Sequence, residues 1–147
     1  MAQATPQSYA NHARYVTGYH RVAFLLLIAY LVWTVVQLFR QHFSVASIFA
    51  LVGAAVLAQV YWYVREFAVG NQNRIIRLEM RLRMEKLLPA DLAARIGEFT
   101  VPQLVALRFA GDGELPALAR KVLDEKITDQ RLIKQRITDW QPDLQRV

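Results

Sequence analysis

The chain has 147 residues, carries a formal net charge of +6, and is 54% hydrophobic and 20% charged. This composition is rich in apolar residues for a soluble domain, and these residues are gathered into two blocks, which is typical of membrane spans. Cysteine is absent, which excludes disulfides, thiolate nucleophiles and cysteine-based metal sites. The chain is also too short for the usual repeat-built transporter, so any transport path would need several copies.

The positive charge is concentrated beside the apolar blocks. Residues 1–64 hold three arginines and no acid, residues 65–88 hold six positive and three acidic residues, and residues 89–147 hold nine of each. A basic collar next to membrane spans is expected to contact anionic lipid headgroups, at about 1 kcal/mol per Lys or Arg. Nucleic-acid binding would instead place the excess on the water-soluble part, so no nucleic-acid partner is expected.

Residues 1–21 are predicted to form an N-terminal leader and a short interfacial helix. Tyr9, His12, Val16 and Tyr19 recur at spacings of three and four residues, which is the pattern of one helical face. Alternatively, these residues are simply the solvated first turns of the span that follows. No secretory signal is expected, because a hydrophilic segment of about twenty residues precedes the first apolar run.

The two apolar blocks, residues 22–39 and 45–64, are each predicted to cross a membrane as a helix. Because the connection between Arg40 and Ser44 is very short, the spans must run antiparallel as a hairpin. More arginines flank the terminal side of this hairpin than its tip, which carries only Arg40. By the positive-inside rule, both termini are predicted to be cytoplasmic and the tip to face outward.

Small and polar residues of the second span bear on how helices pack. Gly53, Ala54 and Ala58 let another helix approach closely, and the simplest partner is the first span. Gln59 lies among apolar residues, where an unpaired amide is costly, so it is expected to pair within the hairpin or with copies of itself around a symmetry axis. The residues predicted to lie at lipid headgroups, with the aromatic ones as an interfacial belt, are Arg14, Arg21, Tyr61, Trp62, Tyr63, Arg65 and Arg74.

The second span is predicted to continue through Gly70 into a basic helical stem, residues 65–88. A continuous helix over residues 45–88 would be about 66 Å long, roughly twice the hydrocarbon thickness of a bilayer. Ile75, Leu78 and Leu82 fit a heptad seam that then meets Glu85, so a long coiled coil is not expected. The whole apolar face of the stem is expected to be buried, either against the chain's own C-terminal helices or against a sister chain; it comprises Ile75, Ile76, Leu78, Met80, Leu82, Met84, Leu87 and Leu88.

Residues 89–147 are predicted to form a small all-helical cytoplasmic module, near the lower size limit for an independent core. Its expected helices cover residues 89–96, 101–110, 114–123 and 128–140, and Thr100 is expected to cap the second. The fold class expected is therefore an all-α membrane protein with a two-helix hairpin, an extended second helix and this module.

No catalytic, cofactor or metal site is expected. His12 and His20 lie on the inner side of the predicted hairpin and His42 at its tip, so they cannot form one metal site within a chain. Asp112 lies between two glycines, lacks the ligand-rich run of an EF-hand, and fits a turn. No phosphate-binding loop and no nucleophile with a base partner is evident, so enzyme activity is not expected.

Three stretches resemble an uncharacterised family of short bacterial membrane proteins with two spans. They are QSYANHARYVTGYH at residues 7–20, QNRIIRLEMRLRMEKLLP at residues 72–89, and QLVALRFAGDGELPALARKVL at residues 103–123. The resemblance covers most of the chain and implies a protein of the bacterial inner membrane. It implies no activity and no site residues.

Two functions fit these features. The first is a noncatalytic, membrane-anchored scaffold or accessory protein that forms homo-oligomers and presents its module to another membrane or cytoplasmic protein. The second is an oligomeric channel whose pore is lined by the second span around Gly53, Ala55 and Gln59. The first is favoured, because one mid-membrane polar group and no charge make a poor ion path.

Overall fold

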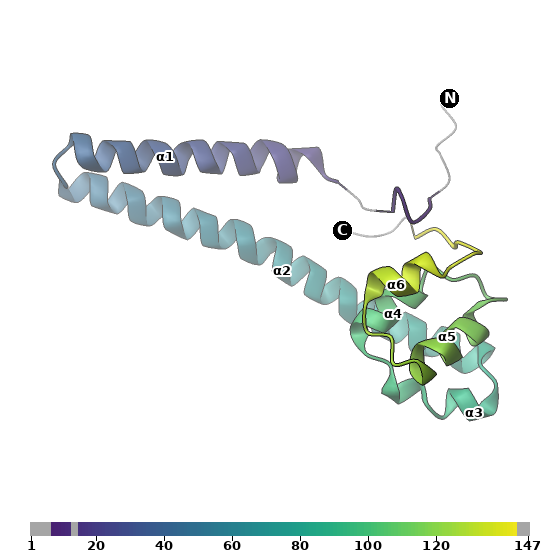
Figure 1. Cartoon of the computed structure of the whole chain (residues 1–147). Coiled ribbons are helices and arrows are strands. Elements are labelled where there is room, and N and C mark those ends of the chain that lie inside the picture. The colour runs from purple at the N-terminus through teal and green to yellow at the C-terminus, as the bar shows by residue number, and fades with distance from the viewer. Residues whose placement is uncertain (1–6, 13–14, 144–147) are drawn as a thin grey trace. The chain divides into compact units, whose positions relative to one another are not determined.

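The computed structural model describes residues 7–12 and 15–143, whose regular elements are all helices (Figure 1). A π-helical turn, η1 (Gly18–Ala23), leads into α1 (Phe24–Arg40), and α2 runs from Val45 to Leu87. Five short elements follow: α3 (Ala90–Ala93), the 3-10 turn η2 (Ile96–Glu98), α4 (Val101–Leu107), α5 (Leu115–Asp124) and α6 (Gln130–Gln135).

Internal contacts divide the chain into two compact units. The hairpin comprises described residues 15–68, and the module comprises described residues 7–12 and 69–143. Helix α2 supplies residues to both units and runs without a break through Gly70.

The hairpin is formed by α1 and the first half of α2, which run antiparallel on either side of a tight turn (Figure 1). His42 and Phe43 have φ angles of 48° and 59°, and this left-handed geometry reverses the chain within a few residues of the end of α1. The amide of Phe43 donates to the carbonyl of Leu38 at 2.9 Å, which satisfies one carbonyl at that helix end. The residues buried within the hairpin are small: Thr34, Ser47 and Ala54.

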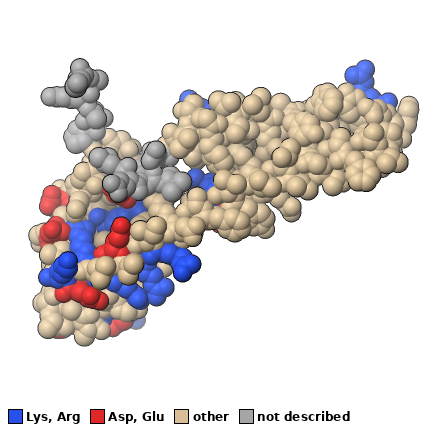
Figure 2. All heavy atoms as spheres, turned by 180° about the vertical axis from the view of Figure 1, so that it is seen from behind, with Lys and Arg blue, Asp and Glu red and all other residues tan. Residues whose placement is uncertain are grey.

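Two helical segments are long and apolar enough to cross a membrane. They are Gly18–Arg40, whose most apolar stretch has a mean hydropathy of 2.4, and Val45–Leu87, whose most apolar stretch has a mean hydropathy of 1.9. Few of their apolar side chains are buried within the chain. Figure 2 shows that charged groups are sparse on the hairpin, where the described residues hold only Arg21, Arg40, Arg65 and Glu66 as charged side chains.

The module is built on one row of the second half of α2. Ile76, Met80, Met84 and Leu88 recur every four residues, so their side chains share one face, and all four are buried. Helices α4 and α5 complete this core with fully buried Leu104, Leu107, Leu115 and Val122, and α6 adds Ile133.

Helix α4 begins with a complete capping box, which contains the cap predicted at Thr100. The backbone amide of Gln103 donates to the Thr100 hydroxyl, and the Gln103 side chain accepts from the Thr100 amide at 2.8 Å. Nε2 of Gln103, a buried group, also donates to the carbonyl of Ile127 at 2.8 Å. One side chain therefore fixes the start of α4 and joins it to the loop after α5.

The structure corrects two expectations about local structure. Residues 8–11 form a turn instead of an interfacial helix, because the Asn11 side chain accepts from the Ser8 amide at 2.6 Å and closes the chain on itself. The last helix ends at Gln135 instead of Trp140. Beyond it, Gly111 donates to the carbonyl of Asp139 at 2.8 Å, and Gln141 donates to that of Phe109 at 2.7 Å.

Candidate interaction surfaces

The stem carries an exposed apolar stripe on the second half of α2, formed by Ile75, Leu78 and Leu82. These side chains are 57%, 62% and 51% exposed, respectively, within the single chain. They are exposed because the later helices of the module pack on the neighbouring row of α2, which contains Ile76 and Met80. We call these three residues the stem stripe. It presents three large aliphatic side chains that the described part of the chain leaves exposed.

The end of the hairpin opposite its tip holds a compact aromatic and basic cluster. The rings of Tyr19 and Tyr61 stack at 4.4 Å between centroids, and each hydroxyl donates to the backbone carbonyl of the other residue. Nη1 of Arg65 lies 3.1 Å from Nε2 of His20, and the guanidinium of Arg21 lies 5.9 Å from the ring centre of Tyr15. The π-helical turn thus brings Tyr19 and His20 against α2.

The residues predicted to lie at headgroups occupy different environments. Tyr61 is half-buried against Tyr19, whereas Trp62 and Tyr63 are exposed. Arg21 and Arg65 lie in the aromatic and basic cluster, and Arg74 is exposed on the module's part of α2. Arg14 lies outside the described residues. Their contact with lipid stays a prediction.

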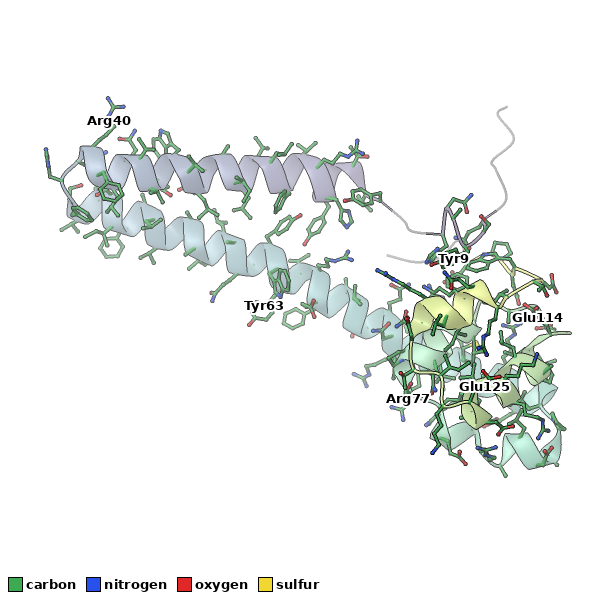
Figure 3. The ribbon with its side chains drawn as sticks, viewed as in Figure 1. Tyr9, Arg40, Tyr63, Arg77, Glu114 and Glu125 are labelled. Atoms are coloured by element: carbon green, nitrogen blue, oxygen red, sulfur yellow. The ribbon has the colours of Figure 1, made fainter. Side chains whose placement is uncertain are left out.

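The predicted packing residues of the second span also separate. Ala54 is fully buried in the hairpin, Ala58 is half-buried, and Gly53 and Gln59 are exposed. Gln59 lines an open cleft of about 360 Å³ on α2. Figure 3 shows Tyr63, another residue of this cleft, on the side of α2 that faces away from α1.

The N-terminal residues 7–12 form a strap that lies on the module. The Gln7 side chain donates to the carbonyl of Asp143 at 3.1 Å and accepts from the amide of the same residue at 2.8 Å, which reproduces the pairing of two backbone segments. Tyr9 lies next to α6 (Figure 3), and its hydroxyl accepts from the side chain of Gln135 at 3.5 Å.

His12 anchors the end of the strap among aromatic rings. Its imidazole stacks on Tyr9 and lies 5.8 Å from the rings of both Phe109 and Trp140. Nδ1 of His12 lies 2.7 Å from the carbonyl of Tyr9, and Nε2 lies 3.1 Å from Nζ of Lys134. A neutral imidazole with its proton on Nδ1 satisfies both contacts, since it donates to the carbonyl and accepts from the ammonium. No local sequence pattern indicates this long-range contact.

Arg83 has a structural role that the sequence pattern did not reveal. Its guanidinium donates to Asp112 Oδ1 through Nε at 2.8 Å and through Nη2 at 2.6 Å. The same group donates to the carbonyls of Arg108 and Ala110 at 3.2 Å and 2.6 Å, respectively. Arg83 therefore satisfies carbonyls after α4 and fixes the turn that contains Asp112. The turn chemistry expected for Asp112 is thus completed by a residue 29 positions away.

Exposed arginine–carboxylate pairs join the outer loops of the module. Hydrogen bonds from Arg95 hold the pKa of Glu98 below its ordinary value, and a hydrogen bond from Arg120 does the same for Asp91. Because the folded pKa values are lowered, these carboxylates contribute stability above their unfolded pKa, about 4, and that contribution is lost as pH falls through the folded values.

Replacing Arg95 with glutamine is expected to raise the pKa of Glu98 toward its ordinary value. The variant should therefore lose less stability than the wild type as the pH falls below about 4. Carboxyl chemical shifts followed through an NMR pH titration of the full chain in detergent would measure the pKa. Arg120→Gln is the matched control, because it should raise the pKa of Asp91 and leave that of Glu98 unchanged. An unaltered Glu98 pKa in Arg95→Gln would contradict the assignment.

Among residues 7–12 and 15–143, no group of three or more His, Cys, Asp or Glu side chains is placed to hold a metal ion.

The structure defines a class of protein: an antiparallel helical hairpin, able by length and composition to cross a membrane, joined by one long helix to a small helical module. The chain belongs to a family of unknown function, DUF6526, which matches residues 1–147. This confirms the resemblance to an uncharacterised family. Comparisons with curated proteins and with solved structures found no match.

Proposed function

We propose that this protein is a noncatalytic, membrane-anchored scaffold that forms homo-oligomers and presents its helical module to another protein. The observation that carries the proposal is the exposure of the stem stripe. Beyond a bilayer, Ile75, Leu78 and Leu82 would meet water, and contiguous apolar surface of this kind marks interaction sites. A second copy of the chain supplies the same stripe at the same height on a parallel helix.

The proposal places the hairpin across the cytoplasmic membrane of a bacterium, with both termini in the cytoplasm. The contact of the strap with the module supports this topology. Gln7 and His12 precede α1, and they touch Asp143 and Trp140 beyond α2. Both ends of the hairpin therefore lead to one body, which requires an even number of crossings between them. The arginine distribution then favours the cytoplasm for that body.

Anionic lipids are proposed as a second partner. Arg21 and Arg65 lie with Tyr15 and His20 at the end of the hairpin from which the chain leads to the module. Arginine and tyrosine are both suited to headgroup depth, where a charged tip or hydroxyl meets water and the rest of the side chain meets lipid. This cluster would hold the hairpin at a fixed depth.

The test is the double variant Leu78→Asp/Leu82→Asp, measured by native mass spectrometry of the full chain in nanodiscs. The wild type is expected to be an oligomer, and the variant is expected to be monomeric, because four or more carboxylates would be forced together in an apolar interface. Leu132→Asp is the matched control, since Leu132 is 50% exposed on α6 outside the stem stripe and should leave the mass unchanged.

A monomeric wild type would contradict the scaffold's self-association. An oligomer that survives the double variant would show that self-association does not require the stem stripe. A closed ring of several copies, conducting ions in planar bilayers with a conductance altered by Gln59→Leu, would favour the channel instead.

A further inference from the structure

The outward side of α2 in the hairpin has the shape of a helix-packing groove. Two rows of side chains, each spaced by four residues, border an open cleft of about 360 Å³. A ridge of a neighbouring helix fits between two such rows. The first row is Val56, Val60 and Val64, and the second is Gln59, Tyr63 and Phe67.

Gln59 is the polar member of this groove, and the chain gives it no hydrogen-bond partner among the described residues. The buried residues of the hairpin lie elsewhere: Thr34 is on α1, and Ser47 and Ala54 are on another face of α2. The hydroxyls of Thr34 and Ser47 donate to the nearby backbone carbonyls of Leu31 and Ser44. Pairing of Gln59 within the hairpin, one of the two expectations from the sequence, is therefore not what the structure has. In a bilayer, its amide would face lipid unsatisfied, which is costly.

We infer that this groove is occupied by α2 of a second copy, with the two Gln59 amides hydrogen-bonded to each other across a two-fold axis. The inference rests on the proposed function and names the membrane contact of that oligomer. An amide carries both a donor and an acceptor, so two of them satisfy each other when related by a two-fold rotation. A lipid acyl chain fits an apolar groove but offers no hydrogen bond.

The geometry of the two copies follows from their shared insertion. Hairpins inserted by the same rule are parallel, so the two-fold axis stands along the membrane normal and equal residues meet at equal depth. Val60 follows Gln59 on the same groove, and it should approach its own symmetry mate. Its branched side chain has few rotamers to lose on packing, which favours a close contact.

Disulfide trapping tests this contact directly, because the chain contains no cysteine. In membranes treated with a mild oxidant, Val60→Cys is expected to form a covalent dimer, since a disulfide requires Cβ atoms within about 4 Å. Leu57→Cys is the matched control at nearly the same depth. Leu57 is exposed but does not line the groove, so it should remain monomeric.

Gln59→Leu tests the amide pair itself. Two copies of this variant should associate about three- to twentyfold more weakly than the wild type, the range expected for interhelical hydrogen bonds in bilayers. The dissociation constant can be measured by energy transfer between labelled chains diluted in vesicles. Gln59→Asn retains an amide and should recover part of the loss.

The outcomes separate this inference from the proposed function. A wild-type oligomer without Val60→Cys trapping, or with trapping equal at Leu57→Cys, would overturn the groove contact and leave the scaffold standing. An unchanged dissociation constant in Gln59→Leu would overturn the amide pair. A monomeric wild type would overturn both proposals, and a higher ring would overturn the two-fold arrangement.

Discussion

Replacing Phe109 with alanine is expected to lower the free energy of unfolding of the module by about 3–5 kcal/mol. Phe109 is fully buried, and Trp140 stacks on it at 4.6 Å between ring centres with the planes 17° apart. The guanidinium of Arg108 lies 4.6 Å from the centre of the ring, and Nζ of Lys134 lies 5.4 Å from it. Removing the ring leaves a cavity and ends its contacts with both cations and Trp140.

The measurement is a urea titration of the full chain in detergent, in which hydrogen exchange of peptides from α4 and α5 reports unfolding of the module. Peptides that contain residues 7–12 should exchange faster in Phe109→Ala even without urea, because His12 loses a ring against which it packs. Leu132→Ala is the control, since an exposed side chain should change the free energy by no more than about 0.5 kcal/mol. A loss below about 1 kcal/mol in Phe109→Ala would contradict the importance of this aromatic cluster.

Replacing Met84 with alanine should lower the free energy of unfolding of the module by about 2–5 kcal/mol. Met84 is fully buried at the centre of the row that α2 contributes to the core, between Met80 and Leu88. Leu82 lies two positions away on the same helix, but it belongs to the exposed stem stripe. Leu82→Ala should therefore change the same free energy by no more than about 0.5 kcal/mol.

The two variants should affect different properties: Met84→Ala the stability of the module, and Leu82→Ala the assembly of copies. Measured as above, Met84→Ala should shift the urea midpoint of the module, whereas Leu82→Ala should weaken the oligomer at an unchanged midpoint. Methionine is flexible, so neighbouring side chains will fill part of the space and the loss should fall in the lower half of the range. Equal midpoint shifts for both variants would show that the buried row is not the one that contains Met84.

The sequence predicted the long elements well, because their signals are long. Two uncharged apolar blocks separated by a few residues lead to the helical segments that the structure contains. Gly70 and Asn71 could have ended α2 as a C-cap. The helix continues, because the strongly periodic segment after them packs four residues of one row into the module.

Which row of the stem is buried could not be read from the sequence. Apolar residues between Ile75 and Leu88 lie on most sides of the helix, so Ile75, Leu78 and Leu82 formed as good a seam as Ile76, Met80 and Met84. Only the shape of the partner surface, built by α4 and α5, selects between them. A heptad seam was the local signal, and tertiary packing overrode it.

The end of α6 and the strap depend on contacts between distant residues. The segment after Gln135 keeps an amphipathic pattern, but its backbone pairs with Phe109 and Gly111 instead of extending the helix. The strap has no pattern that points to Asp143, which lies 136 positions from Gln7. Local periodicity carries no information about such contacts, so they were missed.

The contact between the strap and residues 140–143 also sets an order for folding on the ribosome. Residues 7–12 are synthesised early and their partners, Trp140 and Asp143, are synthesised more than 120 residues later. At about 5–20 residues per second, this delay is many seconds, during which both helices of the hairpin emerge. A chain that stops before residue 140 leaves the strap without these partners. Contacts of the strap with Phe109, Lys134 and Gln135 become available earlier in synthesis, so its pairing with residues 140–143 is the last part of its docking to form.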